Sequence, residues 1–321
     1  MSSGVTPSNS QSDLAATAPS KKASNKKLHG ARAAKNDEFY TQLNDIANEL
    51  KHYRSHFEGK TVFCNCDDPL ESNFWVFFSS QFGLLGLKRL VATHYVPEGQ
   101  SYMLELFEEG GEPVRTPLQG NGDFRSPECV EILKSADIVV TNPPFSLFRE
   151  YVAQLVEHGK RFLVIGNKNA ITYKEIFALI RSNELWLGHG FSAGNAYFKT
   201  PNSEEFGPGV YNPETGLVKF RNVGWFTNME HSKRNEELIL VKKYDPAEYP
   251  KYDNYAAIEV RKVAEIPKDY DGVMGVPITF LDKYNPRQFE IVRFRKGNDE
   301  KDLSVSGKTP YFRILVRKKT A

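Results

Sequence analysis

The sequence predicts an α/β fold with a mostly parallel, doubly wound sheet, followed by a smaller mixed module. Between about residues 60 and 180, short apolar runs typical of buried strands alternate with segments of helical periodicity. Beyond residue 180, short strands are separated by loops rich in Gly, Pro and polar residues. A chain of 321 residues can bury two cores of unequal size. We therefore expect a large domain over residues 36–245 and a C-terminal module over residues 246–321.

The N-terminal segment, residues 1–35, is expected to be a disordered basic tail. It has almost no large apolar residue whose burial would offset the entropy of ordering. Six Lys or Arg residues stand here against one acid, and ten stand against four in residues 287–321, so the part between is acidic in a chain of net charge +2. Basic ends suggest contact with phosphates, although a solvated surface explains each basic run, taken alone, at least as well.

The elements of the large domain follow from periodicity and from turn residues. Residues 45–57 are expected to form a helix with Ile46, Leu50 and Tyr53 on one face. The elements expected next, in chain order, are a strand over 60–64, a helix over 73–82, a strand over 87–93, a helix over 127–135, a strand over 137–141, a helix over 145–158 and a strand over 161–166.

The remaining segments give weaker patterns. A Gly- and Glu-rich excursion is expected near residues 98–122, with Gly122, Asp123 and Phe124 at the end of a third strand. Residues 192–216 are predicted to be polar loop. Further short strands are expected over 185–187, 224–227, 238–241 and, as the closing strand, 311–316.

Composition excludes several classes of protein. No stretch approaches the roughly 18 apolar residues of a membrane helix, and the first thirty residues lack the apolar core of a signal peptide. Cys64, Cys66 and Cys129 cannot all pair, and a Cys-x-Cys without nearby histidines is a poor zinc signature. We expect a cytoplasmic protein with reduced thiols, without a metal site and without membrane contact.

The most informative segment is Asn142, Pro143, Pro144 and Phe145, directly after the predicted strand 137–141. Ligands of open α/β sheets bind at the carboxyl ends of strands. An exocyclic amino group on a planar base is a poor nucleophile, and the Asn142 side-chain oxygen and the Pro143 carbonyl are two acceptors suited to its hydrogens. Phe145 can stack on the base. The loop resembles that of amino-directed methyltransferases which use S-adenosylmethionine; an ordinary proline turn is the alternative.

A second polar turn follows the predicted strand 60–64 and contains Asn65, Cys66, Asp67 and Asp68. It lacks the Gly-x-Gly of a pyrophosphate site, and its negative charge suits a cationic ligand such as the amino group and sulfonium of S-adenosylmethionine. Capping of the next helix is the alternative role of either acid. Upstream, Phe39, Tyr40 and Thr41 place two aromatic rings and a hydroxyl before the first helix; downstream, the Asp123 carboxylate can accept from an adenine amino group.

Five segments together resemble the EcoRI-type family of adenine-specific DNA methyltransferases, from about Asp37 to the C-terminus: DEFYTQ, FCNCDDP, GDFRS, TNPPFSLFREY and GVMGVPITFLDKYNP. The resemblance implies a Rossmann-like sheet that binds S-adenosylmethionine, methyl transfer to adenine N6 of double-stranded DNA by a monomer, and DNA recognition by the C-terminal module. It implies that Asn142, Pro143, Pro144 and Phe145 hold the target base. The residues implied for the cofactor pocket are Phe39, Tyr40, Thr41, Asn65, Cys66, Asp67, Asp68, Asp123 and Phe124.

An enzyme acting on N6 of a paired adenine has to rotate that nucleotide out of the stack. Trp225 is a second aromatic candidate to receive the base, with core packing equally plausible. Four neighbouring basic residues are candidates for phosphate contact or for ordinary surface: Arg221, His231, Lys233 and Arg234. Two other hypotheses remain: a methyltransferase acting on RNA or protein glutamine, and a DNA-binding protein without catalytic activity.

Overall fold

The structure is a computed structural model, and it describes Met1, residues 39–107 and residues 111–319. The predicted tail over residues 1–35 therefore lies, apart from Met1, outside the described residues. None of the helices in the described ranges is long and apolar enough to cross a membrane.

An eight-stranded mixed sheet forms the centre of the fold, with the order β5-β4-β3-β2-β6-β7-β12-β8. The four inner strands β3, β2, β6 and β7 run parallel, whereas the strands beyond them pair antiparallel. The bounds are β2 Thr61–Cys64, β3 Arg89–Thr93, β4 Tyr102–Phe107, β5 Val114–Pro117, β6 Ile138–Thr141, β7 Arg161–Asn167, β8 Trp186–Leu187 and β12 Val223–Thr227.

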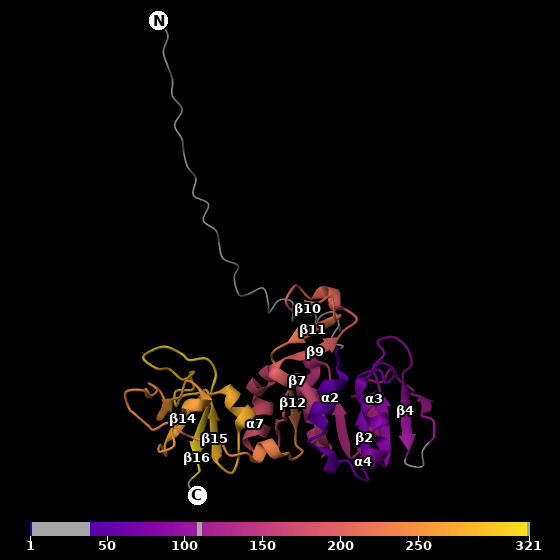
Figure 1. Ribbon diagram of the computed structural model, residues 1–321, viewed down its shortest axis with the longest axis horizontal. Helices are drawn as coiled ribbons and strands as arrows, with labels where there is room; N and C mark the ends of the chain where they lie inside the picture. Colours follow the sequence, from indigo (N-terminus) through magenta and orange to yellow (C-terminus); the bar gives the residue numbers. More distant parts are fainter. Residues whose placement is uncertain (2–38, 108–110, 320–321) are drawn as a thin grey trace. The chain divides into compact units, whose positions relative to one another are not determined.

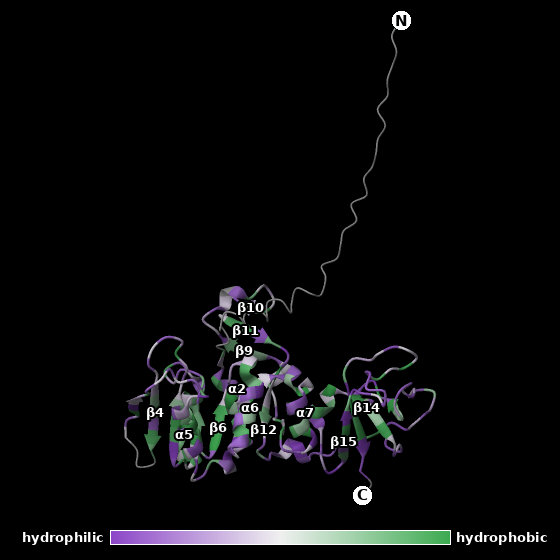
Figure 2. Cartoon of the chain, turned by 180° about the vertical axis from the view of Figure 1, so that it is seen from behind, coloured by the Kyte–Doolittle hydropathy of each residue, from purple (hydrophilic) through white to green (hydrophobic). Residues whose placement is uncertain are grey.

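Helices cover both faces of this sheet because its inner strands are apolar on both sides. In β2, Val62 and Cys64 pack with one apolar cluster and Phe63 packs with the other. Helices α2 and α3 lie on the first face (Figure 1), and α5 and α6 lie on the second (Figure 2). The helix bounds are α2 Leu43–Leu50, α3 Asn73–Ser80, α4 Phe82–Leu85, α5 Pro127–Ser135, α6 Phe148–Glu157 and α7 Lys174–Arg181.

The order of the parallel strands places a switch point between β2 and β6. The chain goes from β2 outward to β3 on one side, and then returns to β6 and β7 on the other side. Connections on the two sides of β2 and β6 leave in opposite directions, and in open α/β sheets a ligand crevice is expected at the carboxyl ends of two such strands. The acidic turn follows β2 and Asn142 follows β6, so both predicted site segments begin at this point.

The predicted α/β class is confirmed, but the expectation of a mostly parallel sheet is wrong at both edges. The excursion near residues 98–122 contains β4 and β5, which extend the sheet beyond β3. Gly122, Asp123 and Phe124 do not end a strand; they lie in the loop between β5 and α5. The predicted helix over 45–57 ends at Leu50 and is followed by a separate 3-10 turn over Arg54–His56.

A second, small sheet has the order β1-β9-β11-β10. In it, β1 pairs antiparallel with β9, so that Tyr40 faces Lys199 and Thr41 faces Phe198. The prediction of polar loop over 192–216 missed two of these strands. The bounds are β1 Tyr40–Thr41, β9 Ala196–Lys199, β10 Tyr211–Asn212 and β11 Leu217–Phe220.

The C-terminal part forms a third sheet with the order β13-β14-β16-β15, in which only β13 and β14 pair in parallel. Its interior holds a buried ion pair between Arg313 and Glu259, to which the Tyr252 hydroxyl also donates. The predicted strand over 238–241 is wrong: this segment has no strand partner, and the side chain of Gln288 binds the backbone of Leu238 instead. The bounds are β13 Ala257–Glu259, β14 Val273–Pro277, β15 Phe289–Phe294 and β16 Arg313–Lys318.

Candidate active site

Hydrogen bonds join the acidic turn to β6 and α6, the elements on either side of the loop that carries Asn142. The Thr141 hydroxyl, at the end of β6, donates to the backbone carbonyl of Asn65. Tyr151 reaches from α6 and donates to the side-chain oxygen of Asn65. Both bonds are buried, and they fix the two predicted site segments beside each other at the switch point.

Asn142 is buried, with 5% of its surface exposed, and its amide is held in one orientation. The amide Nδ2 donates to the backbone carbonyl of Phe39. Since two oxygens cannot share a hydrogen bond, the amide oxygen has to point away from Phe39. That Oδ1 is buried and has no hydrogen-bond partner among the described residues. An unpaired buried acceptor costs about 1–3 kcal/mol, so such a group is typical of a site that binds a donor.

The rest of the loop is ordered around Asn142. Pro143 is buried, and Pro144 and Phe145 are half-buried. The Pro144 carbonyl accepts from the Leu147 N–H at 3.0 Å, which closes the 3-10 turn before α6. The Phe145 ring is stacked on Phe39, with 5.7 Å between centroids and 27° between planes. One face of the predicted stacking residue is therefore covered by Phe39.

The acidic turn is compact, and its two carboxylates have different surroundings. Cys66 has φ +82°, a left-handed conformation that is rare for residues other than Gly, and burial raises the pKa of its thiol well above the ordinary value. The Asp67 carboxylate accepts from the Ser72 hydroxyl at 3.4 Å. Its neighbour Asp68 accepts from the Tyr102 hydroxyl at 2.8 Å and from the Leu70 N–H at 3.0 Å. Asp68 thus serves partly to hold the turn.

His94 follows β3 and faces the same turn. Its Nε2 lies 3.6 Å from Asp68 Oδ2, while its Nδ1 is buried and unpaired within the described part of the chain. Burial lowers the pKa of His94 more than the Asp68 carboxylate raises it. Burial therefore favours the neutral form of this imidazole. The sequence offered no acid at this strand end, and it gave no sign that His94 would contact the turn.

The loop carrying Asp123 approaches the end of β3 closely. The Asp123 carboxylate binds Arg125 through two contacts, Nε to Oδ1 at 2.9 Å and a terminal nitrogen to Oδ2 at 2.6 Å. This hydrogen bonding raises the pKa of the Arg125 guanidinium. The Phe124 ring packs edge-on against Tyr151 at 5.1 Å. A ligand that uses the Asp123 carboxylate has to compete with Arg125.

Substitution of Gly122 tests the close approach of this loop to the end of β3. Its φ is +76°, and an added Cβ would lie 1.9 Å from the His94 carbonyl oxygen. We expect Gly122→Ala to lower the free energy of unfolding by about 2 kcal/mol or more, because the left-handed backbone alone costs Ala about 1–2 kcal/mol. Urea unfolding measures the change. Gly120→Ala is the matched control, since nothing lies within 4 Å of its added Cβ; equal effects of the two substitutions would contradict the close approach.

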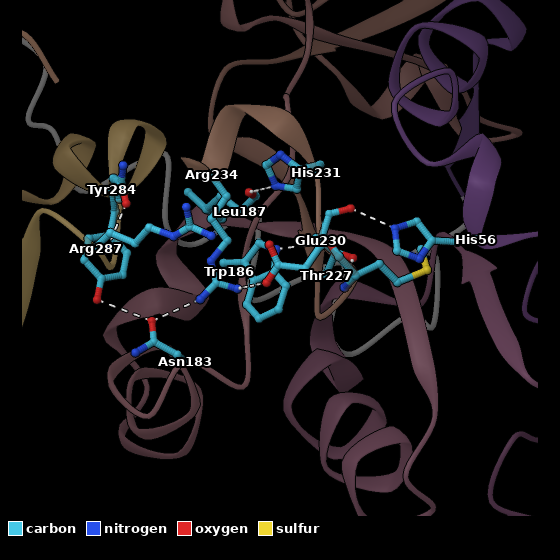
Figure 3. Close-up of polar contacts among 12 residues, drawn as sticks. His56, Asn183, Trp186, Leu187, Thr227, Glu230, His231, Arg234, Tyr284 and Arg287 are labelled. Atoms are coloured by element: carbon cyan, nitrogen blue, oxygen red, sulfur yellow. Dashed lines mark hydrogen bonds and ion pairs between the residues drawn. The ribbon is translucent and has the colours of Figure 1, made fainter. Parts of the chain in front are cut away.

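Two of the residues proposed around the base or the phosphates have other roles in the structure. Trp225 is 1% exposed and stacks on Phe191, so it is a core residue and cannot receive a base. Arg234 is 7% exposed: its guanidinium lies 3.4 Å from the Trp186 ring centroid and binds Asn183 and Glu230 (Figure 3). This burial fits neither of the two roles considered for Arg234, phosphate contact and solvated surface.

The neighbouring basic residues differ in exposure. His231 is 5% exposed, and its ring binds the Leu187 carbonyl at 3.1 Å (Figure 3), which also excludes it from phosphate contact. Lys233 is half-buried and donates to the His189 carbonyl at 2.8 Å. Of the four proposed residues, Arg221 alone is exposed.

The three cysteines are free thiols, as predicted. In the described ranges, no group of three or more His, Cys, Asp or Glu side chains is placed to hold a metal ion. The polar groups at the switch point are instead carboxylates, hydroxyls and an outward amide oxygen. The buried Thr41 hydroxyl, which has no hydrogen-bond partner among the described residues, adds a further group. Such a set can bind a cationic ligand and accept hydrogen bonds from an amino group.

Comparison with known proteins agrees with this geometry. The chain is 50% identical over 318 residues to Type II methyltransferase M.EcoRI of Escherichia coli, covering 92% of this chain and 98% of that protein. It is 42% identical to Type II methyltransferase M.MpnI of Mycoplasma pneumoniae and 38% identical to Type II methyltransferase M.MgeORF184P of Mycoplasma genitalium, each match covering 90% of this chain and 97% of the relative. No solved structure matches the chain.

A family model also matches. The family described as "Adenine-specific methyltransferase EcoRI" matches residues 27–319, nearly the whole described part and both predicted site segments. The resemblance inferred from the five sequence segments is confirmed. The chain belongs to the EcoRI-type family of adenine-specific methyltransferases.

Proposed function

We propose that this methyltransferase transfers a methyl group from S-adenosylmethionine to N6 of adenine in double-stranded DNA. The observation that carries the proposal is the buried, unpaired Oδ1 of Asn142, fixed beside the acidic turn at the switch point of the sheet. The names of the relatives support a role in a restriction-modification system, and the size of the chain supports a separate part for DNA recognition.

The residues around the crevice fit S-adenosylmethionine, which supplies a methyl group activated on a sulfonium. Asp67 and Asp68 would face its cationic groups, and Asn65 and Cys66 would form the floor of the turn. The unpaired Thr41 hydroxyl supports a polar contact on the side of β1. Asp123 would accept from the adenine of the cofactor after releasing Arg125. The remaining proposed lining residues are Phe39, Tyr40 and Phe124.

Asn142 and Pro143 would act on the target amino group. The amide oxygen of Asn142 and the carbonyl oxygen of Pro143 would accept hydrogen bonds from its two N–H groups. These bonds would orient the nitrogen lone pair and stabilise the positive charge that develops on the nitrogen during attack. Pro144 would keep the turn rigid, and Phe145 would stack on the base with the face that Phe39 leaves open.

Access to N6 in a duplex requires the adenine to leave the stack, so we propose base flipping into this crevice. The mixed sheet β13-β14-β16-β15 and its loops would read the DNA, with basic residues of 287–321 contacting phosphates. We expect the protein to act as a monomer, because all the residues proposed for cofactor binding, catalysis and DNA contact lie on one chain.

The test is transfer of radiolabelled methyl from S-adenosylmethionine to three acceptors offered separately and in competition: duplex DNA of diverse sequence, total RNA and a protein mixture. We expect label in DNA as N6-methyladenine, reduced by unlabelled duplex but not by RNA. Label in RNA or protein alone would favour the second hypothesis of a different acceptor. Absence of both label and cofactor binding by calorimetry would favour a DNA-binding protein without catalytic activity.

A further inference from the structure

The hydrogen bond that fixes Asn142 comes from a segment 103 residues away in sequence. The backbone carbonyl of Phe39 accepts from Asn142 Nδ2, and among the described residues this is the hydrogen bond that holds the amide, since its Oδ1 has no partner there. If this carbonyl moves, the amide can rotate and turn its NH2 group toward the crevice. A donor in that position would repel the hydrogens of an amino substrate.

Four aromatic rings surround the Phe39 side chain. Phe220 lies closest, at 5.1 Å between centroids and 79° between planes, and three further rings lie within 6.2 Å. The set, which we name the aromatic nest, consists of Phe145, Phe198, Phe206 and Phe220. Because Phe198 and Phe220 lie on β9 and β11, the small sheet holds the residue whose carbonyl orients Asn142.

The backbone on the other side of Phe39 is fixed as well. Tyr40 and Thr41 pair with β9, and the Asn73 side chain donates to the Thr41 carbonyl at 2.7 Å. The Phe39 carbonyl is therefore held by ring packing on one side and by strand pairing on the other. If only the ring packing around Phe39 is lost, we expect the Phe39 carbonyl to change its orientation while the neighbouring strand β1 stays in place.

We propose that the aromatic nest positions the catalytic amide: it sets the rate of methyl transfer through the Phe39 carbonyl, and its members Phe198, Phe206 and Phe220 do so without contacting substrate or cofactor. Phe220 is the positioning residue of this device. The inference rests on the proposed function, because it concerns how Asn142 accepts from the target amino group. It assigns to β9 and β11 of the small sheet a role in positioning Asn142, beside the cofactor contacts proposed for β1.

The test compares two aromatic residues that both contact Phe198. Phe220 also contacts Phe39, whereas Phe191 contacts Trp225 instead and makes no ring contact with Phe39 in the described structure. We expect Phe220→Ala to lower the single-turnover rate of methyl transfer about tenfold, with the dissociation constants of DNA and cofactor within twofold of wild type. Phe191→Ala should lower the melting temperature but change this rate less than twofold. In Phe220→Leu the Leu side chain fills most of the space of the Phe ring, so this variant should keep most of the wild-type single-turnover rate.

Each other outcome overturns the inference. An unchanged rate in Phe220→Ala, equal losses in the two Ala variants, or a loss that appears in affinity rather than in rate would all do so. If Phe220→Ala does not fold, Phe220→Val and Phe191→Val are compared by the same ratio, since Val leaves part of the ring's space empty and Leu fills most of it. Failure of the proposed function is seen separately, because the wild-type protein would then transfer no methyl group to DNA.

Discussion

Asn142→Ala is expected to reduce the single-turnover rate of methyl transfer by about 10²–10³-fold, the usual cost of removing one preorganised polar group at a reacting centre. The substitution removes the outward Oδ1 and leaves the acidic turn intact. Cofactor affinity should therefore stay within about twofold of the wild-type value. Rapid-quench measurement of methyl transfer together with calorimetric titration of the cofactor separates the two effects.

Asn48→Ala is the matched control for this substitution. Asn48 is exposed on α2 and its side chain contacts only the exposed Lys51 at 3.4 Å among the described residues. The control should keep the wild-type rate. Retention of more than a tenth of the wild-type rate by Asn142→Ala would contradict the role of its amide oxygen.

Asp67→Ala has the second-largest expected effect, and it acts on affinity. A hydrogen bond to a charged group contributes about 1.5–3 kcal/mol, so the loss of the carboxylate is expected to weaken cofactor binding by about 10- to 100-fold. The rate at saturating cofactor should fall much less, because Asp67 lies on the turn after β2 and not on the loop after β6. Calorimetry gives the dissociation constant, and methylation at saturating cofactor gives the rate.

Asp271→Ala serves as the control for charge, since its carboxylate is 76% exposed and lies in the C-terminal part. It should bind cofactor as the wild-type protein does. If Asp67→Ala binds cofactor within twofold of this control, Asp67 has only a structural role, which is to hold Ser72, the residue that caps α3 in place of the two acids.

The central elements could be predicted because local signals and burial agree there. The helix over 127–135 is confirmed to the residue: Ser126 caps its N-terminus and Pro127 occupies the first turn. The buried strands over 137–141 and 161–166 match β6 and β7 within one residue at each end. Both segments are apolar on both faces, which is the pattern of a strand buried inside a sheet.

The edges could not be predicted, because strand formation there depends on a partner distant in sequence. Strand β5 is exposed along its whole length and carries no apolar pattern, so only its pairing with β4 makes it a strand. Residues 238–241 show the opposite case: this apolar run is typical of a strand, but its backbone bonds to the side chain of Gln288, and Leu238 and Leu240 pack against the core without forming a strand. Local propensity does not determine which neighbours are available.

The candidate site likewise has a part that the sequence predicts and a part that depends on distant contacts. That the acidic turn and Asn142 meet follows from strand order, because both stand at carboxyl ends of parallel strands. The contact of Asn142 with Phe39 depends on the fold of β1 against β9, and no pattern in either segment predicts it. The sequence around Trp225 fits base contact and core packing equally, and the buried position of this side chain on β12 shows that it packs in the core.

The most direct test is single-molecule sequencing of DNA from cells that express the wild-type protein or Asn142→Ala. An adenine amino group held by the Asn142 oxygen predicts the kinetic signature of N6-methyladenine at one recurrent sequence with the wild-type protein, and its absence with the variant. A signature on another base, or the same signature from both proteins, would contradict the account.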